Sequence, residues 1–194
     1  MNKVWPYAIV TVIILTSATI HQGVLAALPP TTKTYKNFGL GFQIQYPSNM
    51  TINTGSNVTT IDNPNPQHKS HNYFHTAVIV LPWARAIETL QGLSGLVQGL
   101  FTAPNLDTWA RQFGLAITNE NTTVTNKTKL VVDNTSAYLF QATTVYNHNS
   151  SQVAYHSFYL MLKGNVAYEV SFLIVDQHRF IPVEQKMIRS FRFI

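Results

Sequence analysis

Three histidines, His68, His71 and His75, have a side-chain type and a spacing that could bind a metal ion. Imidazole suits Zn and Cu, and this spacing would place all three side chains on one face of a helix. On a strand, His71 and His75 would share a face and His68 would oppose them. The spacing therefore allows a Cu or Zn site, while a solvated polar loop explains the same residues without metal.

Catalytic motifs are absent from the sequence. There is no nucleophile elbow, phosphate-binding loop, dinucleotide fingerprint or His-Glu-x-x-His motif. The eight carboxylates are dispersed without a close pair for acid/base work, and the absence of cysteine excludes thiolate catalysis and disulfides. We therefore predict that the protein is not an enzyme, and we identify no catalytic residue, organic cofactor or small-molecule substrate.

The charge pattern argues against a nucleic-acid partner. Charged residues make up 11% of the chain, against about 25% in an ordinary globular protein, and the formal net charge is +5. Lys and Arg are scattered along the sequence, whereas nucleic-acid binding needs them gathered on one face. The basic excess favours an anionic partner only mildly.

The N-terminus predicts export. A short basic start, Asn2-Lys3, precedes an apolar stretch over residues 4–20, and Val24-Leu25-Ala26 fits the cleavage rule of signal peptides. Residues 1–26 are therefore expected to be a signal peptide or, alternatively, an uncleaved membrane anchor. Either reading places the rest of the chain outside the cell or at the outer face of the membrane.

Six Asn-x-Ser/Thr triplets agree with export, roughly twice the number expected by chance. Glycans on such triplets are attached at surface loops of secreted proteins. The candidate glycosylation sites are Asn49, Asn57, Asn121, Asn126, Asn134 and Asn149.

The elements that would position these residues follow from periodicity. A linker over residues 27–34 is expected to precede one domain over residues 35–194. Its first half should hold a strand over 42–46, one or two weak strands over 50–61 and a buried strand over 76–82. A helix is predicted over 106–113, with Asn105 as its N-cap and Gly114 as its stop.

The C-terminal half reads as consecutive hairpins followed by a helix. Strands are predicted over 124–132, 136–146, 153–162 and 166–175, with tight turns at Asp133-Asn134 and Gly164-Asn165. A closing helix with Asp176 as its N-cap should bury Phe180, Val183, Met187, Ile188 and Phe191. Pro182 predicts an irregular turn over 177–181, with the regular helix beginning at the proline.

Residues 85–102 look like a helical insertion with few charges and three glycines. Its apolar positions recur at helical spacing, which is typical either of a core helix or of an exposed contact surface. Under the second interpretation, the side chains that would contact a partner subunit or the membrane face are Leu90, Leu93, Val97 and Phe101.

Two runs of sequence resemble PsbP-like domains. Tyr35 through Tyr46-Pro47 is similar to their opening strand, and residues 166–172 followed by 180–183 and 185–191 are similar to their closing strand and helix. The resemblance implies an α+β fold, an antiparallel sheet flanked by helices in an α/β/α sandwich. It favours an exported, non-catalytic module that binds or stabilises a partner at the extracytoplasmic membrane face. The alternative is a protein that handles Cu or Zn through the three histidines.

Overall fold

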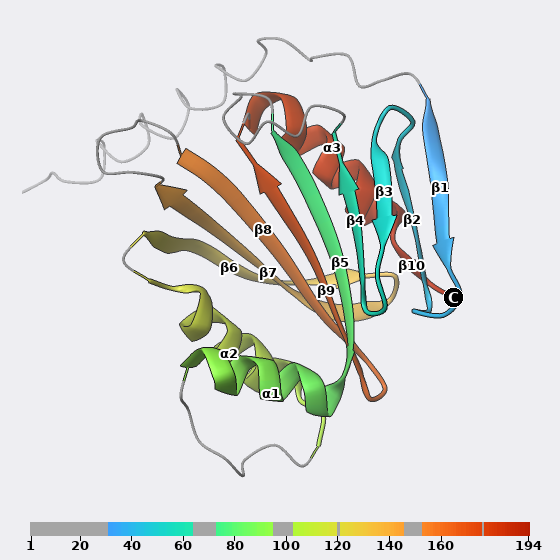
Figure 1. The fold of residues 1–194 in the computed structure, drawn as a ribbon. Coiled ribbons are helices and arrows are strands. Elements are labelled where there is room, and N and C mark those ends of the chain that lie inside the picture. The colour runs from blue at the N-terminus through green and yellow to red at the C-terminus, as the bar shows by residue number, and fades with distance from the viewer. Residues whose placement is uncertain (1–30, 64–72, 95–102, 120, 146–152, 176) are drawn as a thin grey trace, which may run out of the picture.

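The computed structural model describes residues 31–63, 73–94, 103–119, 121–145, 153–175 and 177–194 (Figure 1). A seven-stranded antiparallel sheet has the order β3-β4-β5-β9-β8-β7-β6, and a three-stranded sheet has the order β1-β2-β10. The elements in chain order are β1 (Thr32–Asn37), β2 (Phe42–Pro47), β3 (Thr51–Thr54), β4 (Val58–Asp62), β5 (Phe74–Pro82), α1 (Trp83–Ser94), α2 (Leu106–Ile117), β6 (Thr122–Val132), β7 (Thr135–Val145), β8 (Val153–Lys163), β9 (Val166–Ile174), α3 (Gln177–Ser190) and β10 (Arg192–Phe193).

Helices cover both faces of the large sheet, as the predicted α/β/α sandwich requires. The helix α3 and the small sheet lie against one face, while α1 and α2 lie across the other, at the end where β8 turns into β9 (Figure 1). The fold class is therefore the predicted α+β arrangement of an antiparallel sheet flanked by helices.

The main core lies between the large sheet, α3 and the small sheet. Its largest side chains are aromatic: Phe74 packs against Phe180 with ring centroids 5.0 Å apart, and Phe42 stacks on Phe191 at 5.8 Å. Met187, in the C-terminal half of the closing helix, is 1% exposed. The predicted burial of the closing helix is confirmed, and Lys186 and Arg189 lie outside, also as predicted.

A second core lies between α1, α2 and the opposite face of the sheet. Trp83 of α1 meets Trp109 of α2 edge to face at 6.4 Å, and Phe113 packs on Phe140 and Phe158 of the sheet. The described part of the predicted insertion therefore begins as a core helix, with Ala86 and Ile87 buried.

Turn chemistry explains the hairpins of the C-terminal half. Asp133 and Asn134 both have positive φ, 46° and 58°, and Gly164 has a φ of 60°, as tight two-residue turns require. The strands β7, β8 and β9 pair consecutively and antiparallel, which confirms the predicted order.

Three boundaries differ from prediction. The strand β1 begins at Thr32, inside the segment expected to be a linker, and pairs along β2. The helix α2 continues past Gly114, its predicted stop, to Ile117. Gly114 does not end the helix but allows it to pack closely against Phe140 of the sheet. A Cβ at Gly114 would lie 3.0 Å from the ring of Phe140.

The third difference is the start of the closing helix. The helix α3 begins at Gln177 and runs through Pro182 without the expected irregular turn. Phe180 and Val183, on either side of the proline, are each 4% exposed in the main core. Burial of these two side chains offsets the single backbone hydrogen bond that proline cannot donate. Asp176, the predicted N-cap, lies outside the described residues.

No helix in the described ranges is both long enough and apolar enough to cross a lipid bilayer.

Candidate functional site

Of the three predicted metal ligands, only His75 lies within the described residues. It sits on β5, where its Nδ1 contacts Oδ1 of Asp62 on the neighbouring strand β4. Its ring stacks on Tyr73 at 6.3 Å. His68 and His71 lie outside the described part of the chain, and within that part no three His, Cys, Asp or Glu side chains cluster. A Cu or Zn site at these histidines stays a prediction.

The predicted partner-contact residues also fall outside the description. Val97 and Phe101 follow the end of α1, and nothing is described of the side chains of Leu90 and Leu93 within it. Their role as a contact surface stays a prediction.

Five of the six glycosylation candidates are described, and all five are exposed: Asn49, Asn57, Asn121, Asn126 and Asn134. Asn126 lies on the edge strand β6 and donates a 3.0 Å hydrogen bond from Nδ2 to Oε1 of Gln141. Asn149 lies outside the described residues, and glycan occupancy stays a prediction.

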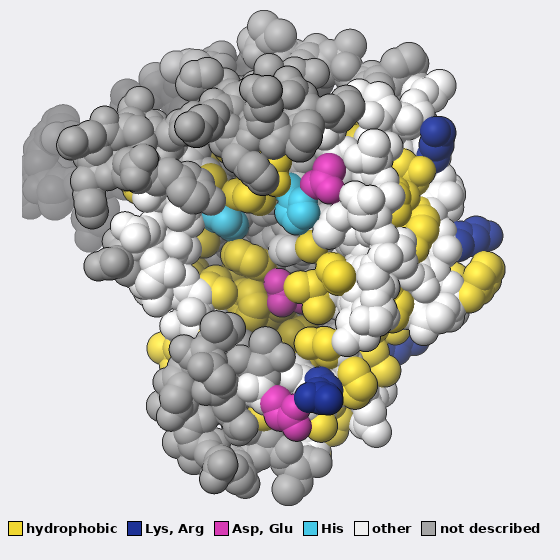
Figure 2. Space-filling model, in the orientation of Figure 1, with side chains coloured by type: hydrophobic (Ala, Val, Ile, Leu, Met, Phe, Trp, Pro, Cys, Tyr) yellow, Lys and Arg dark blue, Asp and Glu magenta, His cyan; other side chains and the backbone are white. Residues whose placement is uncertain are grey.

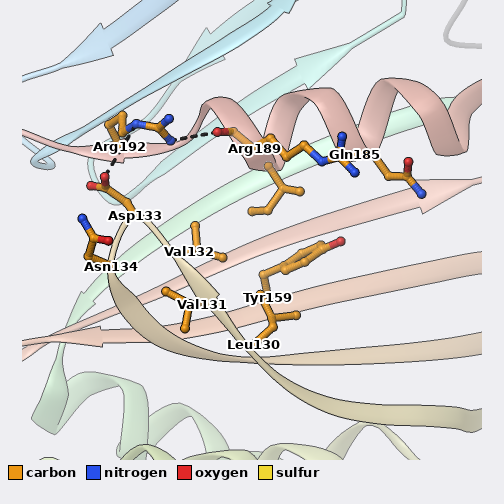
Figure 3. Close-up of a pocket in the computed structure, with 10 residues that line it drawn as sticks. Leu130, Val131, Val132, Asp133, Asn134, Tyr159, Gln185, Arg189 and Arg192 are labelled. Atoms are coloured by element: carbon orange, nitrogen blue, oxygen red, sulfur yellow. Dashed lines mark hydrogen bonds and ion pairs between the residues drawn. The ribbon is translucent and has the colours of Figure 1, made fainter.

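An open groove of about 620 Å³ lies between α3 and the hairpin formed by β6 and β7 (Figure 3). We call it the hairpin groove. It arises because α3 covers the centre of the sheet and leaves the hairpin at the sheet edge uncovered on that side. Its lining residues are Leu130, Val131, Val132, Asp133, Asn134, Tyr159, Gln185, Ile188, Arg189 and Arg192.

The floor of the hairpin groove is apolar. Leu130 and Val132 alternate on β6 with their side chains toward the α3 side, where they join the main core with Tyr159 and Ile188. Val131, between them, points to the opposite face of the sheet and does not add its side chain to this floor. An open apolar floor is the kind of surface that a protein partner covers.

The rim of the groove is basic, and an ion pair and hydrogen bonds connect its two sides. Arg192 of β10 lies with its Nε 3.6 Å from Oδ1 of Asp133, and its Nη1 donates to the backbone oxygen of Arg189 at 2.8 Å (Figure 3). The backbone N–H of Phe193 donates to the other carboxylate oxygen of Asp133 at 2.8 Å. These bonds anchor the β6–β7 turn to the C-terminal strand, so the groove is preformed.

The basic rim continues across α3. A second open groove of about 510 Å³ lies on the other side of the helix and shares Gln185, Arg189 and Arg192 with the hairpin groove. Lys186 lines this second groove and is exposed. The exposed side of α3 therefore forms a positive ridge between two hollows.

A buried polar pair lies beneath the hairpin groove. Tyr159 of β8 donates a 2.9 Å hydrogen bond to Oε1 of Glu184, which is 5% exposed on α3. Burial raises the pKa of the Glu184 carboxyl, opposed by hydrogen bonds from Tyr159 and Ser157. Burial and the neighbouring carboxyl likewise raise the pKa of Tyr159. Tyr159 lines the groove, but its hydroxyl is bonded to Glu184 within the fold.

The opposite side of the sheet carries a different set of polar groups. From the margin of α1 and α2 outward, one surface of the sheet, which we call the open face, is shared by the side chains of His75, Ala77, Ile79, His156, Phe158, Glu169, Ser171 and Leu173. Figure 2 shows this side, hollowed above the helices, with histidine and acidic side chains among hydrophobic ones.

Two polar groups of the open face differ in their partners: one is hydrogen-bonded within the fold, and the other has no partner among the described residues. His156 contacts the hydroxyl of Thr144 through Nε2 at 3.0 Å, and burial lowers the pKa of its imidazole. Glu169 has no hydrogen bond or ion pair among the described residues, and burial raises the pKa of its carboxyl to about 7. Glu169 is not among the residues predicted from the sequence, although its position as a lone acid between apolar strand residues distinguishes it.

No protein-family model matches the chain, and no curated protein is similar to it in sequence. Solved structures are similar in fold. The cyanobacterial PsbP protein CyanoP of Synechocystis aligns with a TM-score of 0.51 at 9% identity, covering 89% of this chain and 96% of its own. The Ran-binding protein Mog1p of Saccharomyces cerevisiae aligns at 0.48 and 10% identity, covering 84% and 95%.

A protein from Bacteroides thetaiotaomicron also aligns at 0.48 and 10% identity, over 84% of this chain and 48% of that one, so the present chain spans about half of its length. At these identities the likeness concerns the fold alone. The TM-score of 0.51 with CyanoP supports a PsbP-like fold for the chain.

Proposed function

We propose that this protein is an exported, non-catalytic PsbP-like module that binds a protein partner at the extracytoplasmic face of a membrane. The observation that carries the proposal is the hairpin groove of about 620 Å³, with its apolar floor and basic rim. Bonds between Arg192, Asp133 and the backbone hold its two sides in place. A preformed surface lowers the ordering cost of association, which supports a binding role.

The chemistry of the groove indicates the kind of partner segment that it would take. Leu130 offers apolar contact, while Arg189 and Arg192 stand at the rim. The one carboxylate of the lining, Asp133, is paired with Arg192. An acidic segment with interspersed apolar residues would complement this surface, since electrostatic complementarity sets specificity and register.

The titratable groups near the groove support binding rather than catalysis. Catalysis needs an acid, base or nucleophile free to reach a substrate. Asp133 accepts from the backbone of Phe193 and pairs with Arg192, and the hydroxyl of Tyr159 is bonded to buried Glu184.

Export rests on the N-terminal pattern of residues 1–26 and on the Asn-x-Ser/Thr triplets. The five described candidate asparagines are exposed, as attachment of a glycan requires.

The test is site-specific photo-crosslinking of the full chain in its native membrane fraction. A photoreactive residue at Leu130, whose side chain faces the hairpin groove, samples this surface, and the same residue at Leu115 of α2, 58% exposed, is the matched control. We expect one partner protein to crosslink from position 130 and not from position 115, and this crosslink to weaken in an Arg189→Glu background. Equal crosslinking from both positions, or a product insensitive to Arg189→Glu, would contradict the proposal.

A metal-handling function is the second candidate, favoured by the contact between His75 and Asp62. A carboxylate bonded to one imidazole nitrogen is the arrangement that orients a metal-binding histidine. The test is metal content and calorimetric titration with Zn or Cu after purification without a His tag. Stoichiometric binding that His71→Ala abolishes supports this function, and the absence of saturable binding ends it.

A further inference from the structure

The centre of the open face holds an acidic side chain that the fold does not neutralise. Glu169 lies on β9, the fourth of the seven strands of the large sheet. Its cross-strand partners are Ile79 on β5 and Leu160 on β8, both apolar. Leu160 is fully buried, whereas Ile79 and Glu169 are half-buried. The carboxyl group therefore sits at the floor of the hollow, at its boundary with solvent.

Cations on this side of the molecule have partners other than Glu169. Lys127 and Lys129 lie on β6, three strands from Glu169, or about 14 Å at the usual strand spacing. Lys127 stands over the ring of Tyr138 at 4.8 Å, and Lys129 pairs with Asp107 at 3.1 Å.

Arg85 of α1 pairs with Glu88 at 3.2 Å. No cation among the described residues pairs with Glu169, and a half-desolvated carboxylate without a partner costs free energy. A positive group brought from outside would remove that cost.

Aromatic and apolar side chains surround the position where such a group would enter. The ring of Phe158 stacks with His156 at 5.7 Å and meets the edge of Phe113 at 5.2 Å. His156 is itself bonded to Thr144, and burial favours its neutral form, so it adds no positive charge near the carboxylate.

The sheet geometry sets the size of the hollow's floor. Glu169 and Leu173 lie four residues apart on β9, about 13 Å along the strand. His75 and His156 pair with Leu173 from either side, so they flank it two strand spacings apart, about 10 Å. A ring with a short side chain fits these dimensions.

We propose that the open face binds a small organic cation, an ammonium group carried on an aromatic body. The ammonium pairs with the Glu169 carboxylate, and the body lies against Phe158 and Ile79. Charge complementarity at Glu169 selects the cation, and the apolar floor selects its body. This site lies on the side of the sheet opposite the hairpin groove, so it does not depend on the proposed function.

The probe is 2-phenylethylamine, titrated by calorimetry into the full-length protein at fixed ionic strength and pH 8. The matched probes are 2-phenylethanol, which has the same body without charge, and 3-phenylpropionate, which reverses the charge. We expect the amine to bind at least tenfold more tightly than the alcohol and the acid not to bind. Comparable affinity for amine and alcohol, or no saturable binding of the amine, would overturn the proposal.

Variants then locate the site. Glu169→Gln keeps the shape and removes the charge, and it should weaken amine binding at least tenfold. Glu88→Gln makes the same change at an exposed carboxylate of α1 and should leave binding unchanged. Arg189→Glu, in the hairpin groove, should also leave it unchanged. Retention of binding by Glu169→Gln, or an equal loss in Glu88→Gln, would refute the site.

Discussion

The two faces of the large sheet differ in whether an acidic side chain has a hydrogen-bond partner among the described residues. On the α3 side, Glu184 is 5% exposed and accepts a hydrogen bond from Tyr159, so its burial is compensated. On the open face, Glu169 sits on the central strand between Ile79 and Leu160 with no described partner. On the α3 side the buried carboxylate is bonded within the fold, whereas on the open face the carboxylate is available to a ligand.

The apolar packing of the two faces differs in the same direction. Alternate residues of β9, from Tyr168 to Ile174, are almost fully buried toward α3, while Glu169, Ser171 and Leu173 remain half-buried on the other side. Stability should therefore depend mainly on the α3 side, and substitutions on the open face or in the hairpin groove should act mainly on binding.

The largest expected effect is on the α3 side. Met187→Ala should lower the free energy of unfolding by about 2–5 kcal/mol, because the residue is 1% exposed and its removal leaves a cavity. Ile181→Ala, on the same helix but 38% exposed, is the control and should cost much less. Chemical denaturation of both variants measures the difference, and equal losses would refute the burial assigned to α3.

A smaller loss is expected from the buried pair. Tyr159→Phe should cost on the order of 1–3 kcal/mol, because it removes a donor from the buried Glu184 carboxyl. Tyr155→Phe on the same strand is the control, since no described hydrogen bond involves its hydroxyl. If both variants unfold at the same denaturant concentration as the parent, Glu184 does not depend on this bond.

Glu169→Gln should act with the opposite sign and depend on pH. Because the folded pKa of about 7 lies above the ordinary 4.5, this carboxyl costs no stability below pH 4.5. The cost grows as pH rises from 4.5 through 7, so the substitution should stabilise the protein by about 1–3 kcal/mol at pH 8 and change little at pH 4.5. Melting at both pH values, with Glu88→Gln as control, checks the sign. A destabilised variant at pH 8 would mean that the fold already pairs this carboxylate.

The smallest effect on stability is expected in the hairpin groove. Arg189 is exposed and its side chain makes no described ion pair, so Arg189→Glu should change the free energy of unfolding by less than about 0.5 kcal/mol. The same variant should reduce the partner crosslink from position 130. A large loss of stability would show that the groove serves the fold rather than a partner.

Local chemistry made part of this molecule predictable. The turns at Asp133-Asn134 and Gly164-Asn165 need residues that tolerate positive φ, and the sequence provides them between alternating strands. The closing helix was predicted because its apolar residues recur at helical spacing. Its first turn was missed because tertiary burial of Phe180 and Val183 outweighs the local effect of Pro182.

Other features depend on contacts that no local pattern reveals. The strand β1 has polar, largely exposed residues and is specified by its pairing along β2. The hairpin groove joins Asp133 to Arg192, residues far apart in the chain. The alternation of β9 placed Glu169 on the less apolar face, but whether a carboxylate has a partner depends on neighbouring strands and helices.

The difference between the two faces depends most directly on the ionisation of Glu169. Its carboxyl carbon can be followed by NMR through a pH titration of the full-length protein, with Glu169→Gln used to assign the resonance. We expect a midpoint near pH 7 for this carboxyl. Adding 2-phenylethylamine should move the midpoint lower, because a bound ammonium favours the charged form. A midpoint near 4.5 without ligand, unmoved by the amine, would show a carboxylate that is already solvated or paired, and would contradict the account.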